Sequence, residues 1–208
     1  MMKLSLEGEV MTWYDYYREA RDTAWKALIE CGISSLPVDL KAIASFYGIE
    51  IVLFSQCALI ELLNPKVRRG DGFIVVINGR KTIFLNDMVK SRRRRRFTVG
   101  HELGHGIIGH PLARINYRNY EGDSKSDPFE MQANVFSRSV LMPACVLNAL
   151  GVSSVDEIMD LCDISQISAA IRLNRLKLLR ERDVFLTSQL EKRVYEQFEP
   201  FIEQTLGR

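Results

Sequence analysis

The stretch RFTVGHELGHGIIGHP (Arg96–Pro111) contains all three histidines of this 208-residue chain. His101 and His105 are four residues apart, so on a helix both rings leave the same face, one turn from each other. Glu102 lies directly beside them. Together they form the H-E-x-x-H pattern, in which two imidazoles bind a zinc ion and the glutamate acts as a general base. The pattern therefore predicts a metal site on a helix.

The neighbouring residues indicate that this helix is buried at the centre of the fold. Val99, Leu103 and Ile107 form an apolar stripe on the side opposite the histidines. A helix that is apolar nearly all round is typical of a protein interior. Buried histidine and glutamate side chains need polar partners, and a metal ion would supply them. The alternative is a pair of core histidines with ordinary hydrogen bonds.

The ends of this helix follow from local signals. Ser91 is a suitable N-cap, and the helix is expected to run to about Gly109, because His110 precedes a proline and is pushed out of the helical conformation. His110 follows His105 by five residues, about 140° further round a continuing helix, so it should not bind the same ion. We expect His110 to be a surface or helix-end residue.

A catalytic zinc site needs a third protein ligand and an open fourth position. Glu130 is the best candidate, and Asn134 shares its helix face one turn later. Asp127, Pro128 and Glu130 also match an N-cap, a first-turn proline and a capping-box glutamate, so both roles remain open for Glu130. Capping does not explain Asn134, a poor helix former in mid-helix. The rival ligands are three nearby acidic residues, Glu121, Asp123 and Asp127.

The remaining pattern predicts an α+β fold, helix-rich, with a small and mainly antiparallel three-stranded sheet packed near the central helix. The β-rich runs are IEIVLFSQ (49–56), GFIVVING (72–79) and KTIFLND (81–87). Asn78-Gly79 predicts a hairpin between the second and the third. Helices are expected at 11–31, between Pro37 and Gly48, from Asp127 to Pro143, and in two or three later segments, the last at 182–204. The length suits a single domain, 1–208.

Composition places the chain among intracellular proteins. The four cysteines are scattered among apolar neighbours without a C-x-x-C pair, which favours reduced, buried thiols over disulfides or a cysteine zinc site. The first residues lack the apolar core of a signal peptide, and no apolar run approaches the roughly 20 residues that cross a bilayer. We therefore expect a cytoplasmic protein without membrane partners.

Five consecutive arginines, Arg92 to Arg96, raise the question of nucleic-acid binding. On a helix they cover more than a full turn, so they cannot form a stripe on one side. They also lie at a helix N-terminus, where the macrodipole disfavours cations. We expect a solvated helix entry in which one or two arginines pair with acidic groups; the alternative is a docking patch for DNA or an acidic partner.

The chain resembles the ImmA/IrrE family of metallopeptidases. The likeness lies in RRRFTVGHELGH (Arg94–His105), EMQAN (Glu130–Asn134) and LMP (Leu141–Pro143), in that order, and extends over about 36–180, with the helices at 11–31 and 182–204 as additions. The resemblance implies that His101, His105 and Glu130 bind Zn²⁺, that Glu102 is the base, and that Asn134 hydrogen-bonds to His101 and orients its ring.

The resemblance also implies a function. It indicates a zinc endopeptidase, with a thermolysin-like ligand set, that cleaves a helix-turn-helix transcriptional repressor and so derepresses mobile-element or stress genes. The alternative is a non-catalytic interaction or antitoxin-like module that retains a structural metal. Glu102 favours the enzyme, because a structural site needs no base and usually has four protein ligands, often cysteines. Candidates for stabilising the oxyanion are Arg114, Tyr117, Arg118 and Tyr120.

Overall fold

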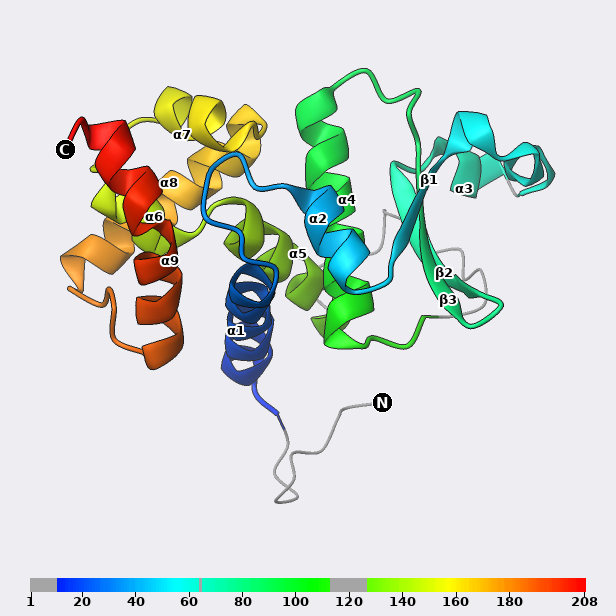
Figure 1. The fold of residues 1–208 in the computed structure, drawn as a ribbon. Coiled ribbons are helices and arrows are strands. Elements are labelled where there is room, and N and C mark those ends of the chain that lie inside the picture. Colours follow the sequence, from blue (N-terminus) through cyan, green and yellow to red (C-terminus); the bar gives the residue numbers. More distant parts are fainter. Residues whose placement is uncertain (1–10, 64, 113–126) are drawn as a thin grey trace.

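The computed structural model describes residues 11–63, 65–112 and 127–208. In Figure 1 the sheet lies on one side of the molecule, α4 (Arg92–Ile108) runs beside it, and α5 (Pro128–Leu141) and α1 (Trp13–Glu30) follow. The other side consists of α6 (Ala144–Ala149), α7 (Val155–Cys162), α8 (Gln166–Glu181) and α9 (Gln189–Leu206). This arrangement confirms the helix-rich α+β class. None of the helices in the described ranges is long and apolar enough to cross a membrane.

The sheet has three strands in the order β1-β3-β2: β1 (Glu50–Leu53), β2 (Gly72–Ile77) and β3 (Arg80–Leu85). β2 and β3 form the expected antiparallel hairpin, whose turn residues Asn78 and Gly79 have φ values of 49° and 78°. Positive φ at both central positions defines the hairpin turn that Asn-Gly favours. β1 joins the free edge of β3 in parallel, so the sheet is mixed.

Successive side chains of the central strand, β3, point to opposite faces of the sheet, and both faces are buried. Ile83 of β3 and Ile74 of β2 belong to the main hydrophobic cluster, next to α4. Phe84 and Val75, one residue further along each strand, point to the opposite face and join a second, smaller cluster. Gly106 allows α4 to lie directly on the sheet, because a Cβ atom there would be 2.8 Å from Ile74 Cδ1.

The second cluster is covered by the chain between β1 and β2. This segment contains two short 3₁₀ helices, η1 (Phe54–Gln56) and η2 (Ala58–Leu62), followed by α3 (Pro65–Arg69). Phe54 and Ile60 pack against the sheet from this side. None of these three short elements was expected from the sequence.

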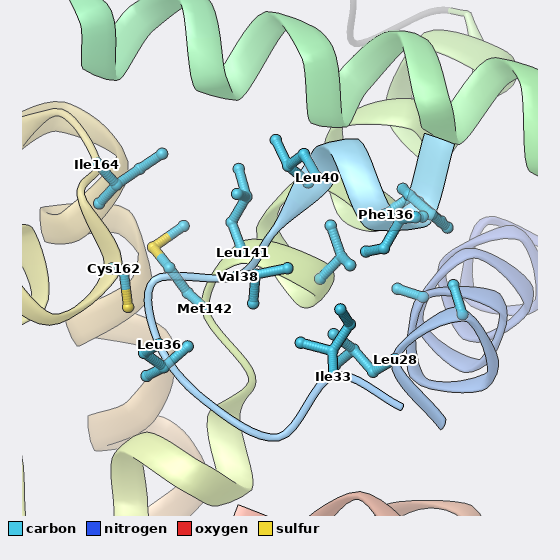
Figure 2. Packing of buried hydrophobic residues seen from close by; sticks show 14 of the residues in the cluster. Leu28, Ile33, Leu36, Val38, Leu40, Phe136, Leu141, Met142, Cys162 and Ile164 are labelled. Atoms are coloured by element: carbon cyan, nitrogen blue, oxygen red, sulfur yellow. The ribbon is translucent and has the colours of Figure 1, made fainter. Parts of the chain in front are cut away.

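The main core lies between α4, α5 and the C-terminal helices. Figure 2 shows the segment from Leu28 to Leu40 crossing this space, with α2 (Leu40–Phe46) following it. Val38 on this segment is fully buried, as are Leu141 and Met142 at the end of α5. Because one cluster extends from Ala24 to Ile202, α1 and α9 pack into the same core as the central helix.

Two glycines let α4 and α5 approach closely. A Cβ atom at Gly104 would lie 3.1 Å from both the Ala133 Cα and the Phe136 Cβ of α5. One at Gly100 would lie 2.7 Å from the Ser137 Oγ. Both distances are shorter than ordinary van der Waals contacts, so larger residues would push the helices apart. This close packing brings the first turn of α5 next to the histidine face of α4.

The chain after α5 differs from the expectation in two respects. Four helices follow α5 in the described part of the chain, where two or three were expected. The last begins at Gln189 rather than at residue 182. Asp183 and Leu186 have φ values of 48° and 54°, which interrupt the helix, and Ser188 caps the new start. Apolar periodicity continues through this turn, which explains the misplaced boundary.

The four cysteines are free thiols, as expected. Cys145 and Cys162 are buried in the main core, and burial raises the pKa of each thiol to about 12. Cys31 and Cys57 are only half-buried, so the expectation of burial is wrong for these two.

The arginine run connects α4 to its neighbours. Arg92, Arg93 and Arg96 lie 2.8, 3.5 and 3.4 Å from the carboxylate of Asp163, which follows the last turn of α7. Arg94 pairs with Asp71, and Arg95 donates to the carbonyl of Val89. Four of the five arginines therefore pair with acidic groups, more than the one or two expected.

We predict that Asp163→Asn lowers the free energy of unfolding by about 3 kcal/mol. Asparagine tolerates the left-handed backbone at this position (φ 50°), so the change removes only the charge that faces Arg96 and its neighbours. The matched control is Asp160→Asn, because the Asp160 side chain is 81% exposed and pairs only with Arg93 among the described contacts. Urea denaturation should show a control effect below about 0.5 kcal/mol. Equal effects of the two variants would contradict the prediction.

Candidate metal centre

Three side chains from two helices converge on one point. His101 and His105 of α4 have their Nε2 atoms 3.1 Å apart. The two carboxylate oxygens of Glu130, in the first turn of α5, lie 3.2 Å from His101 Nε2 and 3.4 Å from His105 Nε2. Both histidines are buried and Glu130 is partly buried. The structure therefore brings together the three residues that the sequence nominated as ligands.

The donor atoms have the spacing of a zinc site. Tetrahedral zinc with ligand bonds of about 2.0–2.1 Å holds neighbouring donor atoms about 3.3 Å apart. His101 Nε2 and His105 Nε2 are 3.1 Å apart, His101 Nε2 is 3.2 Å from Glu130 Oε2, and His105 Nε2 is 3.4 Å from Glu130 Oε1. Two imidazole nitrogens and one carboxylate are also a donor set that zinc binds in catalytic sites. The residues thus fit the ion in both chemistry and spacing.

The electrostatics of the cluster favour a bound cation. Burial by itself would raise the pKa of Glu130, but the close contact of its carboxylate with His101 and His105 holds that pKa far below its ordinary range. Burial would likewise lower the pKa of His101, but the hydrogen bond with Glu130 and the charges of Glu102 and Glu130 raise it. The site therefore holds a carboxylate that remains ionised and favours positive charge next to it.

The residues at the start of α5 explain why Glu130 lies next to His101 and His105. Asp127 is the N-cap and accepts a hydrogen bond from the amide of Phe129, and Pro128 occupies the first turn. These capping residues set where the helix begins, and this places Glu130 on the side that faces α4. Asp127, one of the rival ligands, has this capping role.

Asn134 and Glu102 lie close to the three candidate ligands. Asn134 follows Glu130 by one turn, and its side-chain hydrogen bond contributes to the raised pKa of His101. Glu102 is adjacent to His101 on α4 and only 5% exposed. The charge of Glu102 helps to raise the pKa of His101, so a second carboxylate lies close to the three candidate ligands.

His110 lies at the end of the helix, as expected, but it is buried. It follows the helix, as predicted, because Gly109 adopts a left-handed conformation (φ 83°) and the His110 amide bonds to the carbonyl of His105. It is, however, only 6% exposed, so the expectation of a surface residue is wrong. The reversal of the chain at Gly109 directs the His110 ring back, and its Nδ1 lies 2.8 Å from His105 Nδ1.

A glutamine that the sequence did not single out completes this contact. His110 Nε2 lies 3.0 Å from Gln132 Oε1, and Gln132 is 1% exposed. The amide nitrogen of Gln132 lies 2.8 Å from a carboxylate oxygen of Glu19, on α1. Gln132 shares its helix face with the apolar residues Phe129, Val135 and Phe136, and a polar residue within such a stripe was a possible signal. Nothing in the local sequence marks Glu19, which is more than a hundred residues away.

The other candidates named from the sequence lie outside the described residues. These are the possible oxyanion residues Arg114, Tyr117, Arg118 and Tyr120 and the rival ligands Glu121 and Asp123. The distances given above involve none of these six residues.

Comparison with known proteins agrees with this geometry. No curated protein matches the chain significantly. A model of the M78 peptidase family, described as the IrrE N-terminal-like domain, matches residues 58–174. The matched span contains α4 and α5 and therefore the three converging side chains, but it excludes α1 and α9. Because the match covers more than half of the 208 residues, the chain belongs to the IrrE N-terminal-like family of peptidases.

Proposed function

We propose that this protein is a cytoplasmic zinc-dependent endopeptidase that cleaves a helix-turn-helix transcriptional repressor and thereby derepresses mobile-element or stress genes. The observation that carries the proposal is the convergence of His101, His105 and Glu130 at zinc-ligand spacing, with Glu102 buried next to them. Membership of a peptidase family supports the reaction class. The repressor as substrate comes from the family resemblance alone.

The residues of the site have distinct roles in this proposal. His101, His105 and Glu130 hold the ion, and Asn134 orients the His101 ring. When bound, zinc supplies Lewis acidity, which activates water and polarises a peptide carbonyl. Glu102 accepts the proton of the attacking water and donates it to the leaving amine. A carboxylate next to the ligands is needed for this proton transfer and not for a purely structural site.

The proposal is tested with a helix-turn-helix regulator encoded by a gene that neighbours the gene for this chain. Purified, zinc-loaded protein is incubated with the neighbouring helix-turn-helix protein, and the mixture is analysed by intact mass spectrometry. We expect two fragments whose masses sum to that of the regulator plus one water, and no fragments after treatment with a zinc chelator. Binding of the regulator without cleavage would contradict the enzyme and support the non-catalytic module instead.

A further inference from the structure

A continuous line of hydrogen-bonding groups leads from the candidate metal centre to α1. His105 Nδ1 and His110 Nδ1 are 2.8 Å apart, and His110 Nε2 and Gln132 Oε1 are 3.0 Å apart. Gln132 Nε2 is in turn 2.8 Å from Glu19 Oε2 and 3.3 Å from the Tyr16 carbonyl oxygen. We call His105, His110, Gln132 and Glu19 the relay. It starts on the side of the His105 ring that faces away from Glu130.

The direction of each bond in the relay follows from chemistry. A carboxylate and a backbone carbonyl only accept hydrogen bonds, so the end of Gln132 that faces Glu19 and Tyr16 must be its NH₂ group. Its other end, facing His110, is therefore the amide oxygen. An amide oxygen also only accepts, so His110 Nε2 must carry a proton and donate it.

The remaining bond determines the state of His105. A neutral imidazole carries one proton, so His110 with a proton on Nε2 has a bare Nδ1 that accepts a hydrogen bond. His105 must then donate from its own Nδ1. A neutral His105 with its proton on Nδ1 has a free lone pair on Nε2, the atom that faces His101 and Glu130.

We propose that Glu19, Gln132 and His110 are positioning residues that select the metal-binding tautomer of His105. The proposal rests on the proposed function only in that His105 must be a metal ligand. In this proposal His110 orients the ring of His105, and Asn134 does the same for the ring of His101. The proposal also makes α1, which lies outside the span matched by the family model, a working part of the site.

Burial makes the relay effective. His110 is 6% exposed and Gln132 is 1% exposed, so water cannot readily replace a lost partner. An unsatisfied buried donor is costly, and this cost holds the His110 proton on the nitrogen that faces Gln132. If Gln132 did not accept, the His110 proton could move to Nδ1. His105 would then carry its proton on Nε2 and could not bind the metal through that atom.

Zinc affinity tests the relay directly. In Gln132→Leu and His110→Leu we expect the dissociation constant for zinc to rise about 10–100-fold, as is typical when an orienting partner is lost. His110→Asn retains a side-chain oxygen that can accept from His105 Nδ1 and should restore most of the affinity. Glu19→Ala, at the half-buried end of the relay, should give an intermediate loss because Tyr16 still accepts from Gln132.

The matched control is Ser137→Ala. Ser137 donates a hydrogen bond to the Phe97 carbonyl and so also connects α5 to α4, but it is not part of the relay. This variant should bind zinc like the wild-type chain. A loss as large as that of Gln132→Leu would show that any weakening of the helix pair impairs the site, and would overturn the proposal.

Nitrogen NMR of the imidazole rings provides a second readout that a merely structural role would not change. The chain has only three histidines, so the ring signals can be assigned with single variants. In the metal-free wild-type chain at mildly alkaline pH, we expect His110 to carry its proton on Nε2, and we expect Gln132→Leu to lose this preference. A wild-type His110 with its proton on Nδ1 would overturn the proposal.

The two proposals can fail separately. A wild-type chain that does not bind zinc would contradict the proposed function. Tight zinc binding by the wild-type chain, together with an unchanged affinity in Gln132→Leu, would contradict the relay and leave the proposed function intact.

Discussion

Glu102→Gln is expected to bind zinc with wild-type affinity and to cleave the proposed protein substrate about 10²–10⁴-fold more slowly, the usual contribution of a general base. Glutamine has the same shape as glutamate, so this buried position next to His101 remains filled. Its amide oxygen is too weak a base to accept the proton of the attacking water. The variant therefore separates proton transfer from metal binding.

The measurement is the rate of fragment formation by intact mass spectrometry, with zinc content determined on the same samples. Glu199→Gln is the matched control, because it makes the same chemical change at an exposed position on α9. It should leave both quantities unchanged. Cleavage by zinc-loaded Glu102→Gln at the wild-type rate would show that the proposed mechanism is wrong.

Glu130→Gln is expected to weaken zinc binding by more than the roughly 100-fold that the loss of an outer partner causes. Two neutral imidazoles would remain, without the anionic oxygens that now lie 3.2 and 3.4 Å from them. The choice of glutamine matters because a capping box accepts either glutamate or glutamine at this position of a helix. The substitution therefore preserves any capping role of Glu130 and removes the carboxylate.

Thermal denaturation with and without zinc measures this effect. Zinc at about 1,000 times its dissociation constant stabilises a binding protein by about 4 kcal/mol, and this stabilisation should disappear in the variant. Without zinc, the variant should unfold at a somewhat lower temperature than the wild-type chain, because the carboxylate that contacts the two rings is gone. Retention of the zinc-dependent stabilisation would show that Glu130 is not a ligand.

Features encoded within one turn or one hairpin were predictable from the sequence. The Ser91 cap and the spacing of His101 and His105 depend on helix geometry alone, and the structure has both. The β2–β3 hairpin depends on Asn78-Gly79, which supplies two positive φ angles at low cost. Each of these features is decided by neighbours in the chain and not by the rest of the fold.

Other features could not be derived in this way. The parallel pairing of β1 with β3 depends on contacts between segments far apart in the chain, because an apolar run carries no information on strand direction. The helix expected from residue 182 begins seven residues later, at Gln189, because two left-handed residues interrupt it despite the continuing apolar pattern. Spacing alone did not indicate the burial of His110, which results from the reversal at Gly109.

The amino-acid sequence by itself determined that His101 and His105 lie on one face of a helix, because residues four apart are one helical turn apart. It also placed Glu102 next to His101 on that helix. It offered Glu130 only as a candidate. Tertiary structure decided that Glu130 meets those rings, since Gly100 and Gly104 carry no side chain of their own where α4 contacts α5. It also placed Glu19 behind Gln132 and His110, because packing of α1 against α5 is a contact between distant segments that no local pattern records.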